Sequence, residues 1–384
     1  MAKRKNIAVV YDYNENWIGG TYYIQNLLSA INSIADNKKP VVCVFTNSEK
    51  HYQELKELTG YPYIKQINPS KKKSLLVRAV NKIYRYVVGT NLITGIPAKI
   101  AAVFPAANEY WFQKKQSFLY WIPDFQEHQF PHFFSAWELG ERKKHQQGIL
   151  EKGKQIVFSS EAARKDFNTI YPDNEMRQFV LPFAVTHNHL RENKKNILAA
   201  YNLTQPYFIC SNQFWKHKNH SVILEALALA KQRNPAVTVV FTGKENDHRH
   251  PGYFEELKTR IQQLGIEANT RFLGFIPRSD QLLLMQKSVA VIQPSLFEGW
   301  STVVEDAKSL GANIIASDIE VHKEQLVTYV NKQFFETHNA HELARLLTQQ
   351  LPAGKPLAAR YDYAKDVERF GERFMKIVEQ VSGK

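Results

Sequence analysis

"IQPSLFEGWSTVVEDAKSLGANIIASD", residues Ile292 to Asp318, contains a strand, a loop, a helix and a second strand in that order. The apolar run that ends at Ser295 and the run that begins at Asn313 have the composition of strands buried on both faces. Between them "TVVEDAKSL" has a helical pattern, and Gly311 has the position of the residue that follows a helix. This order predicts a βαβ unit and therefore a parallel sheet.

Short apolar runs alternate with helical patterns along the rest of the chain. The segment 181–206 is polar and charged, and we interpret it as a linker between two sets of strands. The sequence therefore predicts two Rossmann-like α/β domains of similar size. The predicted strands cover residues 6–12, 41–46, 101–106, 118–124 and 155–160 before the linker, and 207–212, 237–243, 270–276, 290–295 and 313–318 after it.

Length, charge and cysteine content limit the class of protein. The 384 residues carry a net charge of +13, which favours anionic partners such as nucleic acids, anionic membranes or phosphorylated ligands. Cys43 and Cys210, the two cysteines, both lie in apolar runs, so we expect them to be buried, with no structural zinc site, in a reducing cytoplasmic compartment. No apolar run reaches about 18 residues, and we expect no transmembrane helix.

The loop "LFEGWS" lies where a predicted strand ends and a helix begins. Backbone N–H groups at a helix N-terminus suit a phosphate or sugar hydroxyls, and Gly299 allows the backbone to approach a ligand closely. Glu298 precedes the helix, where its carboxylate can accept hydrogen bonds from a polyol, and Trp300 is typical of packing. Glu305 has two interpretations, because Thr302-x-x-Glu305 also fits a capping box.

The segment "FEGWSTVVEDA" resembles the paired-glutamate E-x7-E motif of the retaining glycosyltransferases of family 4, and nearly the whole chain fits their layout. The resemblance, which extends to enzymes of bacterial polysaccharide and O-antigen synthesis, implies the GT-B fold, with two Rossmann-like domains facing across a cleft. It implies an acceptor domain over residues 1–190, completed by a helix at about 362–384, and a nucleotide-sugar-binding domain over 200–361.

The same resemblance assigns roles to the motif. Glu305 is expected to bind the ribose of the donor, and Glu298 to lie beside the donor sugar. The backbone between them is expected to contact sugar and diphosphate through Gly299, Trp300, Ser301 and Thr302. The loop around Phe275 and Ile276 is expected to frame the nucleobase.

A second segment, "CSNQFWKHKNHSVILEAL", places basic side chains before another helix. A lysine at a helix N-terminus opposes the helix dipole unless an anion is bound there, so Lys218 predicts an anion site, although a solvated basic loop is the alternative. The segment resembles the diphosphate-binding G-R-x5-K-[GN] pattern of the family, in which Lys218 and Asn219 match the last pair. Asn212 replaces the arginine of that pattern, and Lys216 is the candidate to compensate.

Two segments of the first domain also have counterparts in the family. Gly19 and Gly20 resemble the glycine loop that faces the donor phosphate and the acceptor, although a plain tight turn explains them equally. In many members the strand near residue 124 ends in His-Asp. Here Pro123-Asp124 has that position, so Asp124 matches the aspartate, and His128 is either a substitute imidazole or a surface histidine.

The predicted chemistry is metal-independent glycosyl transfer without a cofactor. No D-x-D motif is present, so leaving-group stabilisation falls to Lys218, helix N-termini and backbone N–H groups. The resemblance implies retention of anomeric configuration. Since no protein nucleophile is evident, a front-face reaction assisted by the leaving phosphate is expected, with Glu298, Lys218 and Asp124 as the catalytic candidates. Glu298 and Glu305 bind hydroxyls in this scheme and are not an acid–nucleophile pair.

Residues 69–100 contain seven Lys or Arg and no Asp or Glu. Apolar side chains from Leu75 to Val87 fall on one helical face, and Arg78, Lys82 and Arg85 fall opposite, which is typical of a basic helix lying on an anionic membrane. The alternative is a helix whose apolar face packs on its own domain. A peripheral position on the inner face of the cell membrane would suit a lipid-linked acceptor.

Three function classes fit the sequence to different degrees. A sugar-nucleotide-dependent hexosyltransferase acting on a saccharide or lipid-linked saccharide fits the motifs. Other GT-B enzymes, such as a nucleotide-sugar epimerase or a phosphorylase, share the fold, but no pyridoxal-phosphate lysine environment is evident. A nucleic-acid-binding protein fits only the charge, because no corresponding motif is present.

Overall fold

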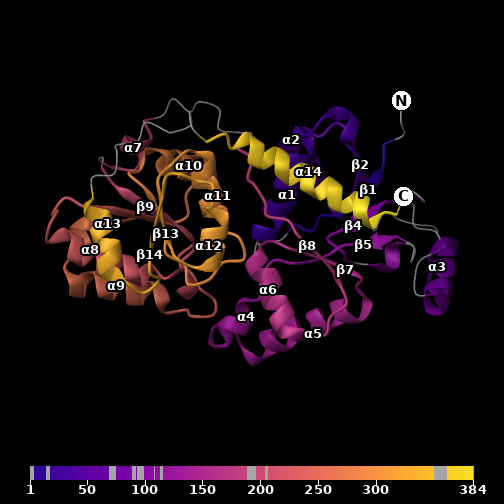
Figure 1. Cartoon of the computed structure of the whole chain (residues 1–384), viewed down its shortest axis with the longest axis horizontal. Helices are drawn as coiled ribbons and strands as arrows, with labels where there is room; N and C mark the ends of the chain where they lie inside the picture. The colour runs from indigo at the N-terminus through magenta and orange to yellow at the C-terminus, as the bar shows by residue number, and fades with distance from the viewer. Residues whose placement is uncertain are drawn as a thin grey trace. The chain divides into compact units, whose positions relative to one another are not determined.

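The structure, a computed structural model, describes residues 4–13, 18–68, 75–88, 92, 99–107, 109–112, 116–187, 196–203, 206–349 and 361–383. The chain divides into two compact units, and each is described by itself (Figure 1). The first unit combines residues 1–124, 140–188 and 364–384. The second combines residues 125–139 and 189–363.

Two parallel sheets form the centre of the first unit. The larger has the strand order β3-β2-β1-β4-β5, and the smaller has the order β6-β7-β8. β1 and β2 are made almost entirely of buried apolar residues, as expected for strands covered on both faces. The strands are β1 (Asn6–Val10), β2 (Val41–Phe45), β3 (Ile64–Ile67), β4 (Ala102–Phe104), β5 (Ser117–Phe118), β6 (Tyr120–Ile122), β7 (Gln155–Phe158) and β8 (Arg177–Val180).

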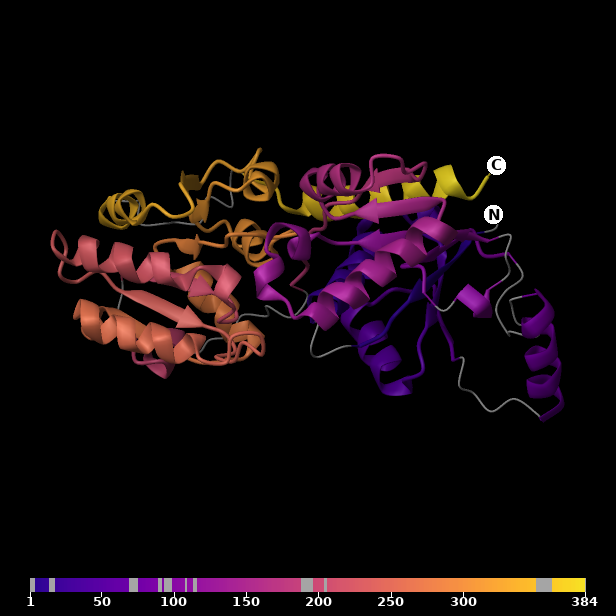
Figure 2. The same cartoon turned by 90° about the horizontal axis from the view of Figure 1, so that it is seen from below.

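Helices surround these sheets. They are α1 (Ile18–Ser33), η2 (Asp36–Lys38), α2 (Glu49–Thr59), α3 (Leu75–Val88), η3 (Glu109–Trp111), α6 (Glu161–Ile170) and α14 (Ala364–Val381). A further helix, α5 (Ala136–Lys152), begins in the second unit and continues into the first. Figures 1 and 2 both show α3 standing apart from the sheet of its unit.

Helix α14, the last helix described, packs along α1 in the first unit (Figure 1). Its apolar stripe, which includes Phe370, Phe374 and Val378, is buried. A Cβ atom at Gly371 would lie 2.3 Å from the carbonyl oxygen of Ala30, so the two helix backbones touch at this point. The end of the described chain therefore completes the core of a unit that begins at the other end.

The second unit contains one six-stranded parallel sheet with the order β11-β10-β9-β12-β13-β14. This is the Rossmann order 3-2-1-4-5-6, in which the direction of strand addition reverses between the first and fourth strands, here β9 and β12. The strands are β9 (Phe208–Ser211), β10 (Val239–Thr242), β11 (Thr270–Phe272), β12 (Val291–Gln293), β13 (Ile314–Ser317) and β14 (Lys332–Phe335). The βαβ unit predicted around residues 290–318 is present as β12, α11 and β13.

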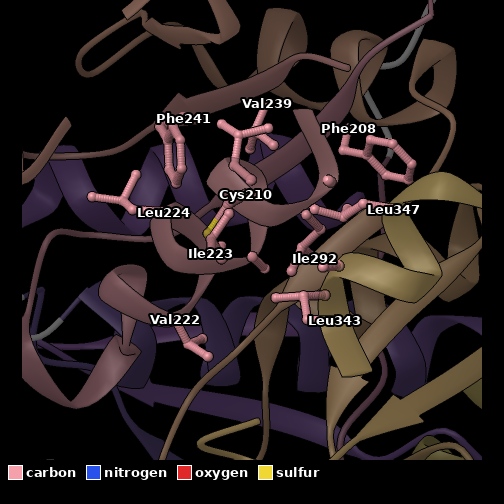
Figure 3. Packing of buried hydrophobic residues seen from close by; sticks show 14 of the residues in the cluster. Phe208, Cys210, Val222, Ile223, Leu224, Val239, Phe241, Ile292, Leu343 and Leu347 are labelled. Atoms are coloured by element: carbon pink, nitrogen blue, oxygen red, sulfur yellow. The ribbon is translucent and has the colours of Figure 1, made fainter. Parts of the chain in front are cut away.

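Helices pack on both faces of this sheet (Figure 2). Side chains alternate along β9, so Phe208 and Cys210 enter one apolar core and Ile209 enters the other. Figure 3 shows the first core, where the expected burial of Cys210 is confirmed. The helices are α4 (Gln126–Gln129), η4 (Pro131–Phe133), α7 (Ile197–Ala200), η5 (Lys216–Lys218), α8 (His220–Lys231), α9 (Tyr253–Leu264), η6 (Glu267–Asn269), α10 (Arg278–Lys287), α11 (Thr302–Ser309), α12 (Glu320–Gln325) and α13 (Ala340–Thr348).

Residues 125–139 group with the second unit, although the sequence analysis includes them in a first domain over residues 1–190. Aromatic contacts explain the grouping, because Phe130 meets Phe297 with ring centroids 6.2 Å apart and Phe133 meets His250 at 5.4 Å. These are long-range contacts, which the local pattern of the segment does not reveal.

Candidate functional site

The candidate site lies at the carboxyl ends of β9 and β12, where the strand order reverses and where open α/β sheets bind their ligands. Hydrogen bonds join the ends of these strands and the segments that follow them. The side chain of Asn212 donates to Gln293 Oε1 at 3.0 Å, and that of Asn219 donates to the carbonyl oxygen of Pro294 at 3.2 Å. The N–H of Leu296 donates to the carbonyl oxygen of His217 at 2.9 Å. The two loops are thus fixed against each other.

An ion pair between Lys218 and Glu298 connects the two loops, with Nζ 2.6 Å from Oε1. The Lys218 side chain is 16% exposed and the Glu298 side chain 9% exposed. Oε1 of Glu298 also accepts from Gln293 Nε2 and Ser295 Oγ, each at 2.7 Å. Burial alone would raise the pKa of Glu298, but Lys218 and His322 hold it below its ordinary value. Glu298 is therefore ionised at neutral pH.

The two carboxylate oxygens of Glu298 differ in their surroundings. Oε1 accepts three hydrogen bonds, from Lys218, Gln293 and Ser295. Among the residues that the structure describes, no donor is bonded to Oε2. A carboxylate that is fixed through one oxygen and open at the other can accept a hydrogen bond from a ligand hydroxyl without rearranging.

Glu305 does not form the capping box that was one of its two interpretations. The N-cap of α11 is Ser301, whose Oγ accepts from the N–H of Val304 at 3.3 Å. Gln325 Oε1 accepts from the Ser301 N–H at 3.2 Å. A glutamine from a different helix therefore binds the N–H group that the reciprocal partner of a capping box would bind.

Buried donors surround the carboxylate of Glu305, whose residue is 1% exposed. Lys308 Nζ lies 3.0 Å from Oε1, Gln325 Nε2 donates to Oε1 at 2.8 Å, and Tyr363 Oη donates to Oε2 at 2.6 Å. Burial raises the pKa of Glu305, and these donors oppose that rise. In this conformation both carboxylate oxygens of Glu305 accept hydrogen bonds from the protein. Among the described residues, donors to Glu298 bind Oε1 alone.

Four basic side chains precede or begin α8, but the structure separates them into two kinds. His217 and His220 are buried, and burial lowers the pKa of both, that of His220 to about 3. The His220 ring stacks on Phe214 with centroids 4.5 Å apart. The two histidines are therefore neutral, and Lys216 and Lys218 carry the positive charge at this end of the helix.

Asn212, which replaces the arginine of the family pattern, is buried and bonded to Gln293. Lys216 has an exposed side chain, and its backbone N–H donates to Asp247 Oδ2 at 3.1 Å. A further cation nearby is Arg249, whose guanidinium lies 4.1 Å from the centroid of the Phe134 ring and 3.2 Å from Glu138. The positive charge of this loop therefore does not come from residue 212, where the family pattern has its arginine.

The other predicted site residues of the second unit lie on the same edge of the sheet. Gly299 and Trp300 are half-buried in the loop before α11, and Thr302 is its first residue. Phe275, in the loop after β11, is 74% exposed, and Lys244 Nζ lies 5.4 Å from its ring centroid. Ile276 packs against the second core.

Gly20 and Asp124 belong to the first unit. Gly19 and Gly20 lie in the first turn of α1, so the expected glycine turn before the helix is wrong for these two residues. Asp124 is half-buried between β6 and α4. His128 lies on α4 with an exposed side chain, 4.0 Å from Glu127.

Metal-binding clusters and membrane-spanning helices are absent from the part of the chain that the structure describes. No group of three or more histidine, cysteine, aspartate or glutamate side chains in that part of the chain is arranged to hold a metal ion. None of the helices in the described ranges combines the length and apolar character needed to cross a lipid bilayer.

Comparisons with known proteins concern the family and the fold of this chain. Residues 191–367 match the family model described as "Glycosyl transferases group 1". The crystal structure of Anabaena Alr3699/HepE in complex with UDP and glucose aligns with a TM-score of 0.62 at 16% identity, over 98% of both chains. A glycosyltransferase structure from Rickettsia africae ESF-5 aligns with a TM-score of 0.66 at 15% identity, over 99% of both chains. The protein has the GT-B fold.

A curated relative matches a smaller part of this chain than the solved structures do. "Putative glycosyltransferase EpsD" of Bacillus subtilis (strain 168) is 26% identical over 170 residues. The match spans 41% of this chain and 42% of that protein. The family model and this relative therefore bear on less than half of the chain, whereas the structural likeness extends over nearly all of it.

Several residues of this site were not predicted from the sequence: Gln293, Ser295, Lys308, His322, Gln325 and Tyr363. The sequence indicates a functional position for one of them, because Gln293 is a polar residue at the end of an otherwise apolar strand. The others come from segments that meet the glutamates only in the folded chain.

Proposed function

We propose that the protein is a retaining glycosyltransferase that moves a hexose from a nucleotide-sugar donor to a saccharide or lipid-linked saccharide acceptor in surface polysaccharide or glycolipid synthesis. The observation that carries the proposal is the Lys218–Glu298 pair at the point where the strand order reverses. A cation and a hydroxyl acceptor held side by side match the two chemical parts of a donor, its diphosphate and its sugar.

Each end of the donor has a candidate partner. Lys218 and the N-terminus of α8 bind the diphosphate, and Glu298 Oε2 accepts a hydroxyl of the sugar. The α11 N-terminus, with Gly299, Trp300, Ser301 and Thr302, adds backbone N–H groups. Phe275, exposed after β11, offers a ring face to the nucleobase.

The reaction breaks the glycosidic C–O bond of the donor through an oxocarbenium-like state. Lys218 stabilises the charge that develops on the leaving diphosphate. Since Glu298 is already paired with Lys218, it acts as a hydroxyl acceptor, and the leaving phosphate takes the acceptor proton on the same face. This scheme uses no cofactor and no metal ion, and it retains the anomeric configuration. Asp124 is the remaining catalytic candidate.

A thermal-shift screen with UDP-, GDP- and dTDP-sugars tests the proposal. UDP-glucose is the first donor to try, because UDP and glucose are bound in the HepE structure. The wild type should be stabilised by one nucleotide class, Lys218→Met should lose most of that shift, and Lys258→Met, which changes an exposed lysine on α9, should keep it. If no nucleotide sugar shifts the wild type, the enzyme proposal fails. An inverted product in an NMR assay of transfer would contradict retention alone.

The proposal also includes a peripheral membrane role for α3. Leu76, Ile83, Tyr86 and Val87 on this helix are 68–94% exposed, so its apolar face does not pack on its own domain as the alternative interpretation required. Arg78, Lys82 and Arg85 are exposed as well. Exposed apolar and basic side chains on one helix suit the interface of an anionic membrane. The rest of the segment predicted to contact membrane, apart from residues 92, 99 and 100, lies outside the described residues.

Liposome flotation tests the charge-dependent part of this membrane role through salt and the apolar part through a substitution on α3. Wild type should float with vesicles containing anionic lipid and lose binding at high salt. Ile83→Glu should abolish binding, and Lys56→Glu, which changes an exposed charge on α2, should leave it intact. Absence of salt-sensitive binding would remove the membrane role without affecting the donor site.

A further inference from the structure

His322 lies on α12, the helix that follows β13, next to the candidate donor site. The residue is completely buried, and its Nδ1 is 2.9 Å from the carbonyl oxygen of Ser317. A carbonyl oxygen can only accept, so the hydrogen of a neutral ring is on Nδ1. Nε2 then presents a lone pair.

Nε2 of His322 is sealed from solvent and, among the residues that the structure describes, has no hydrogen-bond partner. Buried polar atoms of this kind are uncommon, and each calls for a reason. The ring cannot rotate to expose Nε2 without losing its bond to Ser317, whose Oγ in turn donates to the carbonyl oxygen of Ser295 at 2.6 Å. The imidazole is therefore held in place by the hydrogen bond of Nδ1, while Nε2 makes no hydrogen bond to the described residues.

Two charged groups act on this ring from neighbouring segments, Glu298 and Lys218. Burial lowers the pKa of His322, Glu298 raises it, and Lys218 lowers it further. On its own helix, Glu320 is exposed, and Lys323 pairs with Asp318 at 3.3 Å. The protonation of His322 is thus linked to the ion pair that the donor would meet.

A diphosphate bound beside Lys218 changes the effects of both Lys218 and Glu298 on the pKa of His322. Its negative charge favours a protonated ring, and it shares the Lys218 ammonium, so that Glu298 loses part of its counter-charge. The unpartnered Nε2 is the atom that can take a proton in response.

We propose that His322 is a positioning residue that takes up a proton from solvent on Nε2 when a diphosphate binds beside Lys218, and so keeps a positive charge next to Glu298. This inference rests on the proposed function. The protonated ring maintains the ionised, oriented Glu298 while Lys218 engages the diphosphate. Since binding and proton uptake favour each other, nucleotide affinity increases as the pH falls through the range between the free and bound pKa values of His322.

Calorimetry of nucleoside diphosphate binding tests the inference. UDP and GDP are titrated into the full chain at neutral pH in two buffers that differ in ionisation enthalpy. Wild type should show a buffer-dependent heat that corresponds to net uptake of up to about one proton per bound molecule. His322→Asn should lose most of this uptake, because its side-chain amide can still donate to Ser317 but cannot titrate.

Two controls separate His322 from other titrating groups. His217→Gln removes another buried imidazole influenced by Lys218, and its proton uptake should equal that of wild type. The phosphate of the nucleotide titrates identically with every variant and cancels in the comparison. If His322→Asn does not fold, His322→Gln takes its place in the comparison, because its side chain also cannot titrate.

The outcomes separate this inference from the proposed function. Equal uptake by wild type and His322→Asn, or binding without any buffer-dependent heat, overturns the role of His322 and leaves the donor site standing. Absence of binding by every nucleoside diphosphate overturns the proposed function and, with it, this inference.

Discussion

At the scale of single residues, the Lys218–Glu298 pair is a functional arrangement more than a stabilising one. A buried ion pair gains little over apolar packing, but removing one partner leaves a charge without compensation. Lys218→Ala should therefore lower the free energy of unfolding by about 3 kcal/mol in urea titrations. Lys216→Ala, at an exposed neighbour, should change it by less than about 0.5 kcal/mol. Equal losses for the two variants would show that Glu298 is not dependent on Lys218.

Tyr363 tests whether Glu305 binds ribose. Its hydroxyl donates to Glu305 Oε2, the kind of bond that a ribose hydroxyl would make. Tyr363→Phe keeps the ring and removes the competing donor, so nucleotide affinity should increase, by up to about tenfold for one hydrogen bond to a charged group. Calorimetry with UDP measures the change. A weaker complex would mean that Tyr363 positions Glu305 and that the ribose binds elsewhere.

Two S/T-x-x-E segments, one at the start of α11 and one at the start of α5, show what a local sequence cannot decide. Thr302-x-x-Glu305 fits a capping box but forms none, whereas Ser135-x-x-Glu138 forms one, with the Ser135 N–H 2.8 Å from Glu138 Oε2. The difference lies in distant partners, because Lys308, Gln325 and Tyr363 bind the carboxylate of Glu305. The sequence predicted Glu298 in the loop before a helix and Glu305 on that helix, but not the partners of either carboxylate.

At the scale of elements, the capping box gives the start of α5 a defined pH dependence. Burial would raise the pKa of Glu138, but bonds from Ser135 and Arg249 lower it from 4.5 to about 2. A lowered pKa stabilises the fold fully above 4.5, and this contribution is lost as the pH falls toward 2.

Glu138→Gln keeps an oxygen that accepts from the Ser135 N–H but loses the charge beside Arg249 and the helix N-terminus. It should therefore destabilise the protein at neutral pH by about 0.5–1 kcal/mol, and the difference from wild type should shrink below pH 4.5. Urea midpoints across this pH range give the measurement. Glu141→Gln, on the same helix with an exposed side chain, should follow wild type throughout. A pH-independent difference would assign the effect to packing.

The contact of α1 with α14 leads to a second prediction, which concerns the stability of helix packing. Gly371→Ala places a Cβ 2.3 Å from the Ala30 carbonyl oxygen, so the helices must separate, and we expect a loss of about 2 kcal/mol or more. Gly148→Ala, in α5 with nothing within 4 Å of its Cβ, should instead stabilise the protein by about 0.5–1 kcal/mol. Thermal unfolding of both variants decides, and a neutral Gly371→Ala would show that the helices can move apart freely.

Apolar content decided which strands could be predicted. β1, β2, β9, β10 and β13 are continuous apolar runs and were predicted with small errors at their ends. The strands that the sequence does not predict are β3, β8 and β14, which lie at sheet edges and carry polar residues such as Lys65, Arg177 and Lys332. An edge strand has one neighbour and partial exposure, so its composition resembles that of a loop.

At the scale of the whole molecule, the candidate donor residues are unevenly distributed. Lys218, Phe275, Glu298 and Glu305 lie in the second unit, whereas Gly20 and Asp124 lie in the first. Hydrogen–deuterium exchange with UDP should therefore show protection in the loops after β9, β11 and β12, and little change in α3. Protection limited to the first unit would contradict the proposed donor site.

The sequence predicted the two-unit α/β architecture because buried parallel strands and amphipathic helices leave strong local patterns. It did not predict that residues 125–139 group with the second unit, since their contacts with Phe297, His250 and Arg249 depend on the folded chain. Long-range contacts of aromatic segments have no local signature.

The packing of α14 on α1 has a consequence for biosynthesis. Ribosomes release the chain from its N-terminus, so β1 and α1 emerge first, but the helix that covers α1 emerges after every residue of the second unit. Until then the apolar face of α1 lacks its cover, while the second unit already has all of its residues. The unit that is translated first is therefore completed last, and its nascent form exposes an apolar surface of the kind that chaperones bind.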